Sequence, residues 1–333
     1  MKIIVPMAGM GKRMRPHTLT IPKPLLPVAG KPIVQRLVED IIKTCNEKVD
    51  EVAYVIGNFG SAVEKNLISI AENAGAKGTI YYQDEPRGTA HAVLCAGDSL
   101  KGKAVVAFAD TLFRTDFTID ASQDGVIWVK KIENPDAFGV VKINDENIIT
   151  DFVEKPKTFV SDLAIIGIYY FKDSAYLKQE LQYLIANNIK DKGEFQLTSA
   201  LENMKNKGTR FVPGTVIEWL DCGNKDATVH TNRRILELHK GNHLIASSVK
   251  KENAVIIAPC YIGDNVEIKN SVVGPHVSVG NNSRIINSVV QNSIIQTHAT
   301  IIAANIDNSM IGNYVEYAGD KRDLSIGDFS TQS

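Results

Sequence analysis

Residues 2–14 read KIIVPMAGMGKRM, and the tetrapeptide IPKP follows at residues 21–24. The short apolar run Ile3–Val5 is followed by a loop that contains two glycines, Gly9 and Gly11. Glycines let the backbone turn sharply and bring bare N–H groups close to an anion. The stretch therefore predicts a strand that opens into a phosphate-binding loop.

Three basic side chains accompany this loop: Lys12, Arg13 and Lys23. Lys23 stands between Pro22 and Pro24, and proline restricts the backbone, so a flexible cation is held in one place. A lone Gly-x-Gly describes an ordinary strand-to-helix turn at least as well as a phosphate site. The lysine between two prolines favours the phosphate site.

Beyond the loop, β-branched runs alternate with amphipathic ones as far as about residue 130. This alternation predicts a parallel sheet covered by helices, in which ligands collect at the carboxyl ends of the strands. We expect strands at 3–5, 51–56, 79–82 and 104–108, and helices at 32–44, 60–73, 89–98, 173–187, 196–206 and 225–240.

Further motifs follow in an order that resembles the sugar-phosphate nucleotidyltransferases. These are Gln83–Ala92, Phe108–Asp110, Phe138–Val141, Val153–Pro156, Gly167–Tyr169, Glu194–Thr198 and Trp219–Gly223. The resemblance implies an α/β fold, a Rossmann-like mixed sheet, for a catalytic domain over residues 1–240. It implies transfer of a nucleotidyl group from a nucleoside triphosphate to a sugar-1-phosphate, with glucose-1-phosphate and dTTP or UTP as the expected pair.

The resemblance also assigns roles to individual residues. Arg13 is expected to hold the leaving pyrophosphate, and Lys23 is expected to hold the α-phosphate. Thr89 is expected to cap the helix that begins at residue 89. On the nucleotide side it implies Ala8, Gly9, Gly11, Gln83, Gly88 and Thr89, and on the side of the sugar phosphate Gly139, Glu154, Lys155, Gly167 and Glu194.

Two aspartates are the expected metal ligands, Asp110 and Asp221. Each stands at the end of an apolar strand-like run, and Mg²⁺ prefers one or two carboxylates together with phosphate oxygens. The reaction joins two anions, so charge neutralisation by Mg²⁺, Lys and Arg is the main task, and no covalent nucleophile is needed.

Several positions depart from the common pattern of the family. Lys12 stands where a Thr or Ser is usual, and Ala109 stands where a Gly is usual. Ile165 replaces a usual Asn, and Ser199 replaces a usual Asp. The short opening loop resembles that of bacterial uridylyltransferases more than that of thymidylyltransferases. The base and the sugar therefore stay open. A mannose-1-phosphate guanylyltransferase, a cytidylyltransferase for aminoalcohol phosphates and a catalytically silent regulatory homologue are the alternatives.

The C-terminal part has a different period. Aliphatic residues recur every five or six positions, which exceeds the repeats of a helix and a pleated strand and resembles the hexapeptide repeat of left-handed parallel β-helices. We expect such a β-helix at 241–320, with three to four coils, and a polar tail at 321–333. The expected interior positions are Ile257, Ile262, Ile268, Val273, Val279, Ile285, Val290, Ile295, Ile301, Ile306 and Ile311.

Histidines and a cysteine near the motifs invite catalytic interpretations. We expect structural roles for His17, His91 and Cys222, because a sugar phosphate is already an anion and needs no general base. His276 and His298 are the candidates for a second, acyltransferase site, since some β-helices use a histidine between subunits. An assembly surface, and hence a homo-oligomer, is the preferred interpretation of the β-helix.

Composition sets limits on the partners. The 333 residues carry a net charge of -1, with 44% hydrophobic and 23% charged residues, so nothing favours nucleic acid as a partner. The four cysteines lack metal-ligand spacing, and no apolar stretch approaches a membrane span. These features predict a cytoplasmic protein with a small partner and no membrane attachment.

Overall fold

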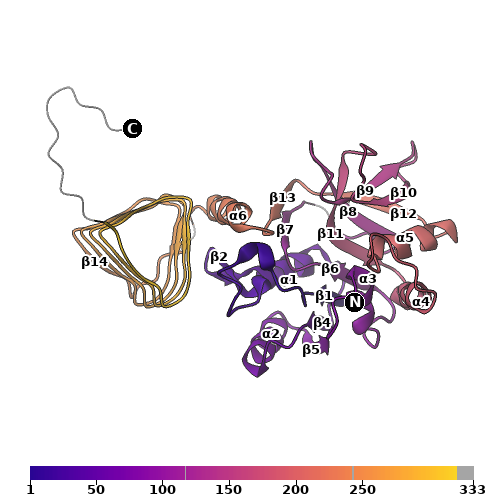
Figure 1. The fold of residues 1–333 in the computed structure, drawn as a ribbon, viewed down its shortest axis with the longest axis horizontal. Helices are drawn as coiled ribbons and strands as arrows, with labels where there is room; N and C mark the ends of the chain where they lie inside the picture. The colour runs from indigo at the N-terminus through magenta and orange to yellow at the C-terminus, as the bar shows by residue number, and fades with distance from the viewer. Residues whose placement is uncertain (117, 242–243, 321–333) are drawn as a thin grey trace. The chain divides into compact units, whose positions relative to one another are not determined.

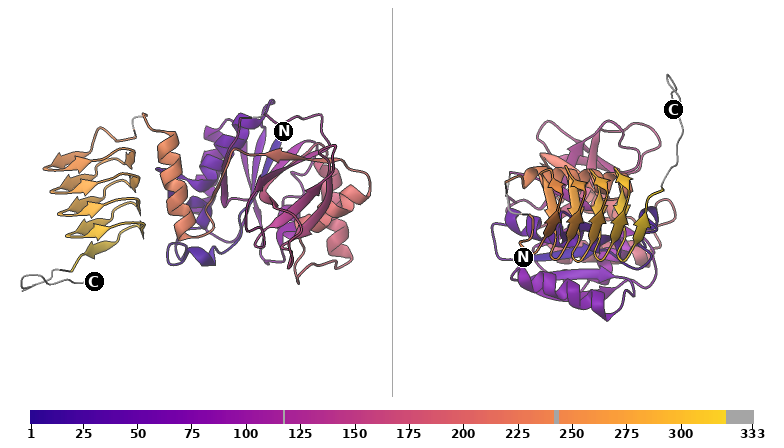
Figure 2. Two further views of the ribbon diagram at one scale, coloured as in Figure 1. Left: turned by 90° about the horizontal axis from the view of Figure 1, so that it is seen from above. Right: turned by 90° about the vertical axis from the view of Figure 1, so that its left-hand side faces the viewer.

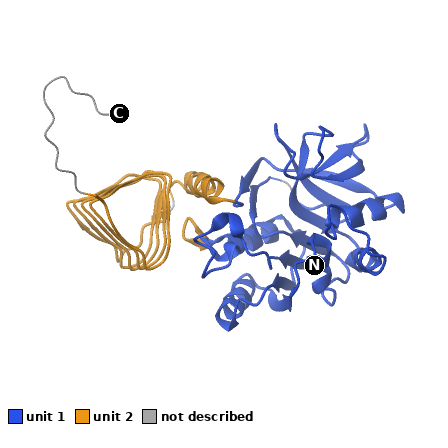
Figure 3. Ribbon diagram, in the orientation of Figure 1, with its two compact units in different colours: residues 1–26, 32–223 blue, residues 27–31, 224–333 orange. Residues whose placement is uncertain are grey.

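The computed structural model describes residues 1–116, 118–241 and 244–320. Contacts divide the chain into two compact units, coloured separately in Figure 3. The first comprises Met1–Leu26 and Pro32–Gly223, and the second comprises Pro27–Lys31 and the chain from Asn224 onward. This division differs from the expected boundary at residue 240, because the preceding helix groups with the second unit. The expected polar tail, 321–333, lies outside the described residues.

A mixed sheet of nine strands forms the first unit (Figure 1). Its parallel part has the order β6-β1-β4-β5, which confirms the predicted sheet, and β11 runs antiparallel beside β6. The strands are β1 (Lys2–Pro6), β4 (Glu51–Ile56), β5 (Lys77–Tyr82), β6 (Ala104–Ala107), β8 (Gly125–Lys131), β9 (Gly139–Ile143), β10 (Ile149–Glu154), β11 (Leu163–Phe171) and β12 (Phe211–Thr215). Outside this sheet lie β2 (Pro27–Val28), β3 (Lys31–Pro32) and the antiparallel pair β7 (Thr111–Arg114) and β13 (Glu218–Asp221).

The helices lie close to the predicted positions. Helix α1 buries Ile33, Leu37 and Ile41, which recur every four residues and so share one face. Helix α3 ends at Cys95, three residues earlier than predicted, where the N–H of Gly97 already donates to the carbonyl of Leu94. The helices are α1 (Ile33–Thr44), α2 (Ser61–Asn73), α3 (Thr89–Cys95), α4 (Ser174–Ala186), α5 (Leu197–Asn206) and α6 (Lys225–Leu238), with 3₁₀ turns η1 (Lys12–Met14) and η2 (Lys23–Leu25).

The second unit contains the predicted left-handed parallel β-helix, whose triangular cross-section is visible in Figure 1. Its short strands form three parallel sheets of five, four and four strands, so the described residues make four complete coils and one further strand, more than the three to four expected. Figure 2 shows the coils stacked one on the next. The strands are β14 (Lys250–Glu252), β15 (Val255–Ile256), β16 (Cys260–Ile262), β17 (Glu267–Lys269), β18 (Val272–Val273), β19 (Val277–Val279), β20 (Arg284–Ile286), β21 (Val289–Val290), β22 (Ile294–Ile295), β23 (Thr300–Ile302), β24 (Asn305–Ile306), β25 (Met310–Ile311) and β26 (Glu316–Ala318).

The interior of the β-helix is filled by the predicted aliphatic residues, with one correction. Residues from Ile262 to Ile306 in the predicted series are buried, and Ile311 packs against them. Ile257 was expected inside but is 43% exposed, and its neighbour Ile256 packs against the core instead. The one-residue shift occurs because Ile256 ends strand β15 in register with Val273.

Left-handed backbone at the corners explains the asparagines between the strands. Asn270, Asn287 and Asn308 have positive φ, a conformation that asparagine tolerates better than most residues. His276 and His298 have φ of 63° and 58° and occupy such corners too. His298 stacks on Tyr314 with the ring centroids 4.7 Å apart. Both histidines therefore lie in left-handed corners between the strands.

Candidate active site

The opening loop connects β1 to helix α1 and contains both 3₁₀ turns. Gly11 has φ of +55°, and a Cβ there would lie 3.0 Å from Cβ of Lys23. A side chain at this position would therefore crowd the lysine. Gly9 has nothing within 4 Å of its Cβ position, so its backbone is open to an approaching ligand.

Lys23 and the two predicted metal ligands meet at the carboxyl edge of the sheet. Nζ of Lys23 lies 2.9 Å from Oδ2 of Asp110, which follows β6. Asp221 ends β13, where the ladder sets it opposite Thr111. The N–H of Cys222 donates to the carbonyl of Asp110 at 2.9 Å and joins the two segments.

The charges around Asp221 oppose one another. Burial raises the pKa of the Asp221 carboxyl above its ordinary value, and the negative charge of Asp110 raises it further. The N–H of Gly223, which donates to Oδ1 at 3.0 Å, and the cations Lys23 and Arg13 act in the opposite direction. A further cation near the two carboxylates would relieve their repulsion.

The carboxylates of Asp110 and Asp221 fit a Mg²⁺ ion whose remaining ligands come from a substrate and from water. No group of three or more His, Cys, Asp or Glu side chains suited to a metal occurs within 1–116, 118–241 and 244–320. Asp110 and Asp221 are only two carboxylates, but Mg²⁺ commonly takes one or two from the protein and the remaining oxygens from water and phosphates. The pair therefore suits an ion that arrives with a nucleotide.

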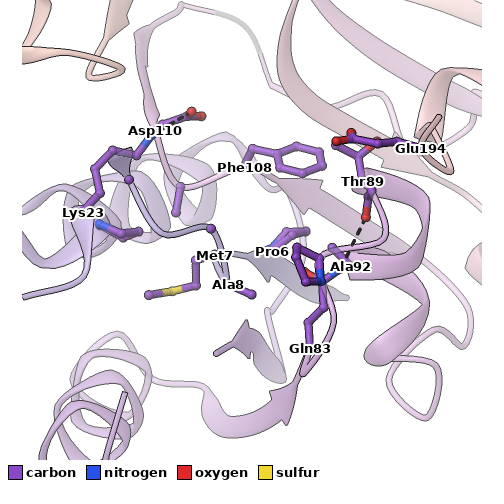
Figure 4. Close-up of a pocket in the computed structure, with 16 residues that line it drawn as sticks. Pro6, Met7, Ala8, Lys23, Gln83, Thr89, Ala92, Phe108, Asp110 and Glu194 are labelled. Atoms are coloured by element: carbon purple, nitrogen blue, oxygen red, sulfur yellow. Dashed lines mark hydrogen bonds and ion pairs between the residues drawn. The ribbon is translucent and has the colours of Figure 1, made fainter. Parts of the chain in front are cut away.

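A cavity of about 290 Å³ opens beside the loop (Figure 4). Lys23 and Asp110 lie on one side of it, and Gln83 and Thr89 lie on the other. Phe108 lies between these two sides. The lining of this cavity combines the opening loop with the β5–α3 turn. It includes the predicted residues Ala8, Gly9, Gly11, Lys23, Gln83, Gly88, Thr89, Asp110 and Glu194.

The β5–α3 turn requires glycine at one position. Gly88 has φ of +117°, and a Cβ there would lie 2.5 Å from the carbonyl oxygen of Phe195. The N–H of Ala90 donates to that same carbonyl at 2.9 Å. Any side chain at Gly88 would thus separate two segments that hydrogen bonds hold together.

The prediction that Thr89 caps α3 is wrong. The N-cap is Gly88, which has no side chain to accept a hydrogen bond. Oγ1 of Thr89 instead accepts from the N–H of Leu197 at 2.9 Å and lies 3.1 Å from Oε1 of Gln196. Thr89 therefore satisfies the first N–H of α5, a helix more than a hundred residues further along the chain.

A second cavity, of about 250 Å³, shares Thr89, Phe108 and Asp110 with the first. Strands β9 and β10 set Glu154 opposite Gly139, where a Cβ would lie 3.1 Å from the Glu154 carboxylate. The lining of this second cavity includes the predicted residues Arg13, Gly139, Glu154, Lys155, Gly167 and Asp221.

Polar contacts hold the residues of this second cavity. Oγ1 of Thr198 donates to Oε2 of Glu154 at 3.2 Å, and the half-exposed Lys155 lies 3.5 Å from Oε1 of Glu154. Lys155 has φ of 41°, and the ammonium of Lys192 donates to the carbonyls of both Glu154 and Lys155. These contacts fix the backbone that carries Lys155.

Gly167 makes a bend in β11 next to the shared wall. It has φ of +86°, and the ladder with β8 shifts register between Ile165 and Tyr169. Its carbonyl accepts from the N–H of Phe108 at 2.9 Å. The bend therefore helps to hold Phe108 between the two cavities.

All the predicted site residues line one or both cavities. Glu194 was expected on the sugar side but lines the first cavity, where its carboxylate accepts from Gln196 at 3.3 Å. Sequence reasoning missed Lys192, Gln196 and Thr198, although the last two stand inside a quoted motif. Phe108, Tyr169 and Trp219 also line the second cavity.

The two cavities adjoin at Asp110 and carry cationic side chains on both sides. The family model for nucleotidyl transferases matches residues 2–237, and the chain belongs to this family. A glucose-1-phosphate thymidylyltransferase from Streptomyces griseus is 28% identical over 95% of this chain and 93% of its own length.

Other relatives match over a shorter range. The low-salt glycan biosynthesis nucleotidyltransferase Agl11 of Haloferax volcanii is 29% identical over 71% of this chain, and the bifunctional protein GlmU of Methanocaldococcus jannaschii is 31% identical over 77%. The matches span only 66% and 59% of those proteins' lengths. A crystal structure of UDP-glucose pyrophosphorylase complexed with UDP-glucose shares the fold, with a TM-score of 0.58 at 23% identity, over 71% of this chain and 98% of that chain.

In the part of the chain that the structure describes, no helix combines the length and apolar character needed to cross a bilayer. No disulfide bond joins the four cysteines.

Proposed function

We propose that this chain transfers a nucleotidyl group from a nucleoside triphosphate to a sugar-1-phosphate and releases pyrophosphate. The observation that carries the proposal is the pair of adjoining cavities, which share Asp110 and have cationic side chains on both sides. Glucose-1-phosphate with UTP or dTTP is the proposed substrate pair. Mannose-1-phosphate with GTP is the second combination to test.

The proposed reaction is an attack by a phosphate oxygen of the sugar-1-phosphate on the α-phosphorus of the nucleotide. Lys23 would neutralise the α-phosphate, and Arg13 would hold the pyrophosphate as it leaves. Both tasks are electrostatic, so the residues work by position and charge rather than by bonding covalently to the substrate. The contact of Lys23 with Asp110 supports its assignment, since it holds the ammonium at the boundary of the two cavities.

We assign the Mg²⁺ to Asp110 and Asp221. When bound, the ion neutralises charge on phosphate oxygens and orients them. The two carboxylates would hold it, while Lys23 and Arg13 would offset what remains of the phosphate charge.

On the acceptor side, Lys155 would bind the phosphate of the sugar-1-phosphate, and Glu154 would accept hydrogen bonds from sugar hydroxyls. Lys192 supports both assignments because it donates to the backbone carbonyls of these two residues. Gly139 and Gly167 leave room for the ring, since neither presents a side chain to the cavity.

A screen of nucleotides against sugar phosphates tests the proposal. The full chain is incubated with Mg²⁺, one of UTP, dTTP, GTP, CTP or ATP, and one of several hexose-1-phosphates, and pyrophosphate is measured. We expect pyrophosphate only when nucleotide and sugar phosphate are both present. Release with a nucleotide alone, or with none of the pairs, would contradict the proposal.

The β-helix is proposed to assemble subunits into a homo-oligomer through residues 250–317. Val255 and Val289 support this, being 56% and 45% exposed on the sheet formed by β15, β18, β21 and β24. An apolar stripe on a rigid sheet face favours association with a matching surface. We also propose a reducing, cytoplasmic setting, which the four unbridged cysteines support.

A further inference from the structure

The segment between Lys23 and helix α1 groups with the second unit. The chain leaves the first unit after Leu26 and returns at Pro32, and the residues between them form most of the hairpin β2–β3. Figure 3 draws residues 27–31 in the colour of the β-helix. Only three residues separate this hairpin from Lys23, so the two units are joined by the chain close to the active site.

The turn of the hairpin has an unusual backbone. Ala29 and Gly30 have φ of 46° and 81°, and two positive φ values in a row are typical of a type I′ hairpin turn. Glycine adopts this conformation readily, but alanine rarely does, because its Cβ approaches the backbone. Contacts from the surrounding structure must therefore hold the turn.

Asn232 of helix α6 provides one of these contacts. Its side chain is fully buried, and Oδ1 accepts from the N–H of Ala29 at 2.8 Å and from the hydroxyl of Ser278 in β19 at 2.7 Å. Its Nδ2 donates to the carbonyl of His276 at 3.4 Å. Five residues further along α6, Glu237 lies 3.2 Å from Nε2 of the same histidine. Asn232 thus joins the hairpin to the β-helix.

Tyr261 of strand β16 provides the second contact. A Cβ at Gly30 would lie 2.2 Å from the ring of Tyr261, so the ring packs directly on the glycine. Any side chain at Gly30 would displace the ring. The β-helix therefore contacts both residues of the turn, Ala29 through Asn232 and Gly30 through Tyr261.

The chain between the hairpin and Lys23 has little freedom to absorb a movement. Pro22, Pro24 and Pro27 restrict the backbone on both sides of the lysine. The N–H of Leu26 donates to the carbonyl of Lys23 at 3.0 Å, and Leu26 is fully buried. A shift of the hairpin would therefore pass along this short segment to the lysine.

We propose that Asn232 and Tyr261 are positioning residues for Lys23, so that the β-helix supports the active site as well as assembly. Both act through the hairpin, and neither lines either of the two cavities of the site. The role of Lys23 in this inference rests on the proposed function. A cation that stabilises a transition state depends on its position, and a misplacement of about 1 Å can lower a rate about a hundredfold.

Hydrogen exchange of the full chain without substrates tests the connection. Asn232→Leu is similar in size but cannot form the hydrogen bonds. We expect the amides of Leu25 and Leu26 to exchange about tenfold or more faster in this variant than in the wild type, because local bonds open more often when their support is lost. Tyr261→Ala should act in the same direction, whereas Tyr261→Phe keeps the ring and should stay close to the wild type. Unchanged exchange in folded Asn232→Leu and Tyr261→Ala proteins would overturn the inference.

Steady-state kinetics tests the consequence for the reaction. We expect kcat to fall about tenfold or more in Asn232→Leu and Tyr261→Ala, while the KM for the sugar-1-phosphate stays near the wild-type value, because Lys23 acts mainly in the transition state. Faster exchange with an unchanged kcat would show that the hairpin does not position Lys23. A wild type without turnover would contradict the proposed function instead, and hydrogen exchange would then decide the inference alone.

Two control variants separate positioning from β-helix stability and from assembly. Ser283→Ala removes two buried hydrogen bonds inside the β-helix, one to the carbonyl of Gln296 and one from the N–H of Ala299. Val289→Glu alters the proposed assembly surface. Both should leave the exchange of the Leu25 and Leu26 amides unchanged, and an effect as large as that of Asn232→Leu would overturn the inference.

Thermal melting of all the variants checks that they fold. Should Asn232→Leu fail to fold, the comparison of Tyr261→Ala with Tyr261→Phe decides, because Tyr261 is only half-buried and its loss is easier to tolerate. Equal exchange and equal kcat in these two proteins would then contradict the positioning role.

Discussion

The ammonium of Lys23 lies 2.9 Å from a carboxylate oxygen of Asp110, although 87 residues separate them in the chain. The contact follows from the order of the sheet, in which β6 lies directly beside β1. The loop after β1 and the turn after β6 therefore leave the sheet at the same edge, where ligands collect in open α/β sheets. A cation from one segment and a carboxylate from the other thus mark the place where the two cavities meet.

Removing the charge of either proposed metal ligand should abolish most of the activity. Asp110→Asn and Asp221→Asn keep the side-chain shape. We expect Mg²⁺-dependent pyrophosphate release to fall at least about a hundredfold in each, because a metal at the transferred group stabilises the charge of the transition state by several kcal/mol. Asp145→Asn, in the exposed turn between β9 and β10, is the matched control and should behave like the wild type. Near-normal turnover of either active-site variant would refute the metal assignment.

Two cations should have separable kinetic effects. Lys155→Ala should mainly raise the KM for the sugar-1-phosphate, by about tenfold or more, because its proposed partner is present in the ground state and the transition state alike. Arg13→Ala should mainly lower kcat, since pyrophosphate gains charge as it leaves. Steady-state kinetics with each substrate varied in turn separates the two. A Lys155→Ala variant that weakens only nucleotide binding would show that its position in the acceptor site is wrong.

The tight approach at Gly88 can be compared with an open glycine. Gly88 and Gly60 both have positive φ, and each directly precedes a helix. A Cβ at Gly88 would lie 2.5 Å from the backbone oxygen of Phe195, whereas a Cβ at Gly60 would meet nothing within 4 Å. We expect Gly88→Ala to lower the free energy of unfolding by about 2 kcal/mol more than Gly60→Ala, since strain and overpacking add to the backbone cost. Urea unfolding followed by tryptophan fluorescence measures this, because Trp128 and Trp219 both belong to the first unit. Equal effects would mean that the turn can move away from Phe195.

Assembly through the β-helix should depend on its exposed apolar stripe. Val289→Glu introduces a charge opposite Val272 in the same sheet, and burying that charge would cost more than the contact gains. We expect the variant to have a lower mass by light scattering at about micromolar concentration, a range in which modest interfaces dissociate. Val289→Thr, nearly equal in shape, should retain more of the assembled form. A monomeric wild type would contradict the assembly proposal.

Local patterns predicted most of the architecture. The repeat of aliphatic residues predicted the β-helix because each coil face needs one inward side chain, and the error at Ile257 arose where two adjacent isoleucines satisfy the same pattern. The end of α3 and the number of coils were missed for another reason, since element boundaries depend on contacts that a periodic pattern does not contain.

The site was harder to predict in its details. Every residue that the motifs predicted lines at least one of the two cavities. The bond from Thr89 to α5 and the contact of Lys192 with the Glu154 carbonyl, however, join segments far apart in sequence. A threonine at a helix start ordinarily indicates a cap. Here Gly88 takes that position, which frees the Thr89 hydroxyl for a partner that only the folded chain supplies.

The joining of a nucleotide to a sugar phosphate can be followed directly. Phosphorus-31 NMR of the full chain with Mg²⁺, UTP or dTTP, and glucose-1-phosphate follows all the phosphorus species at once. We expect equal amounts of pyrophosphate and a nucleoside-diphosphate sugar, formed as glucose-1-phosphate disappears, with no nucleoside monophosphate. Formation of nucleoside monophosphate while glucose-1-phosphate remains unchanged would contradict it, as would the absence of any nucleoside-diphosphate sugar with these substrates and with GTP and mannose-1-phosphate.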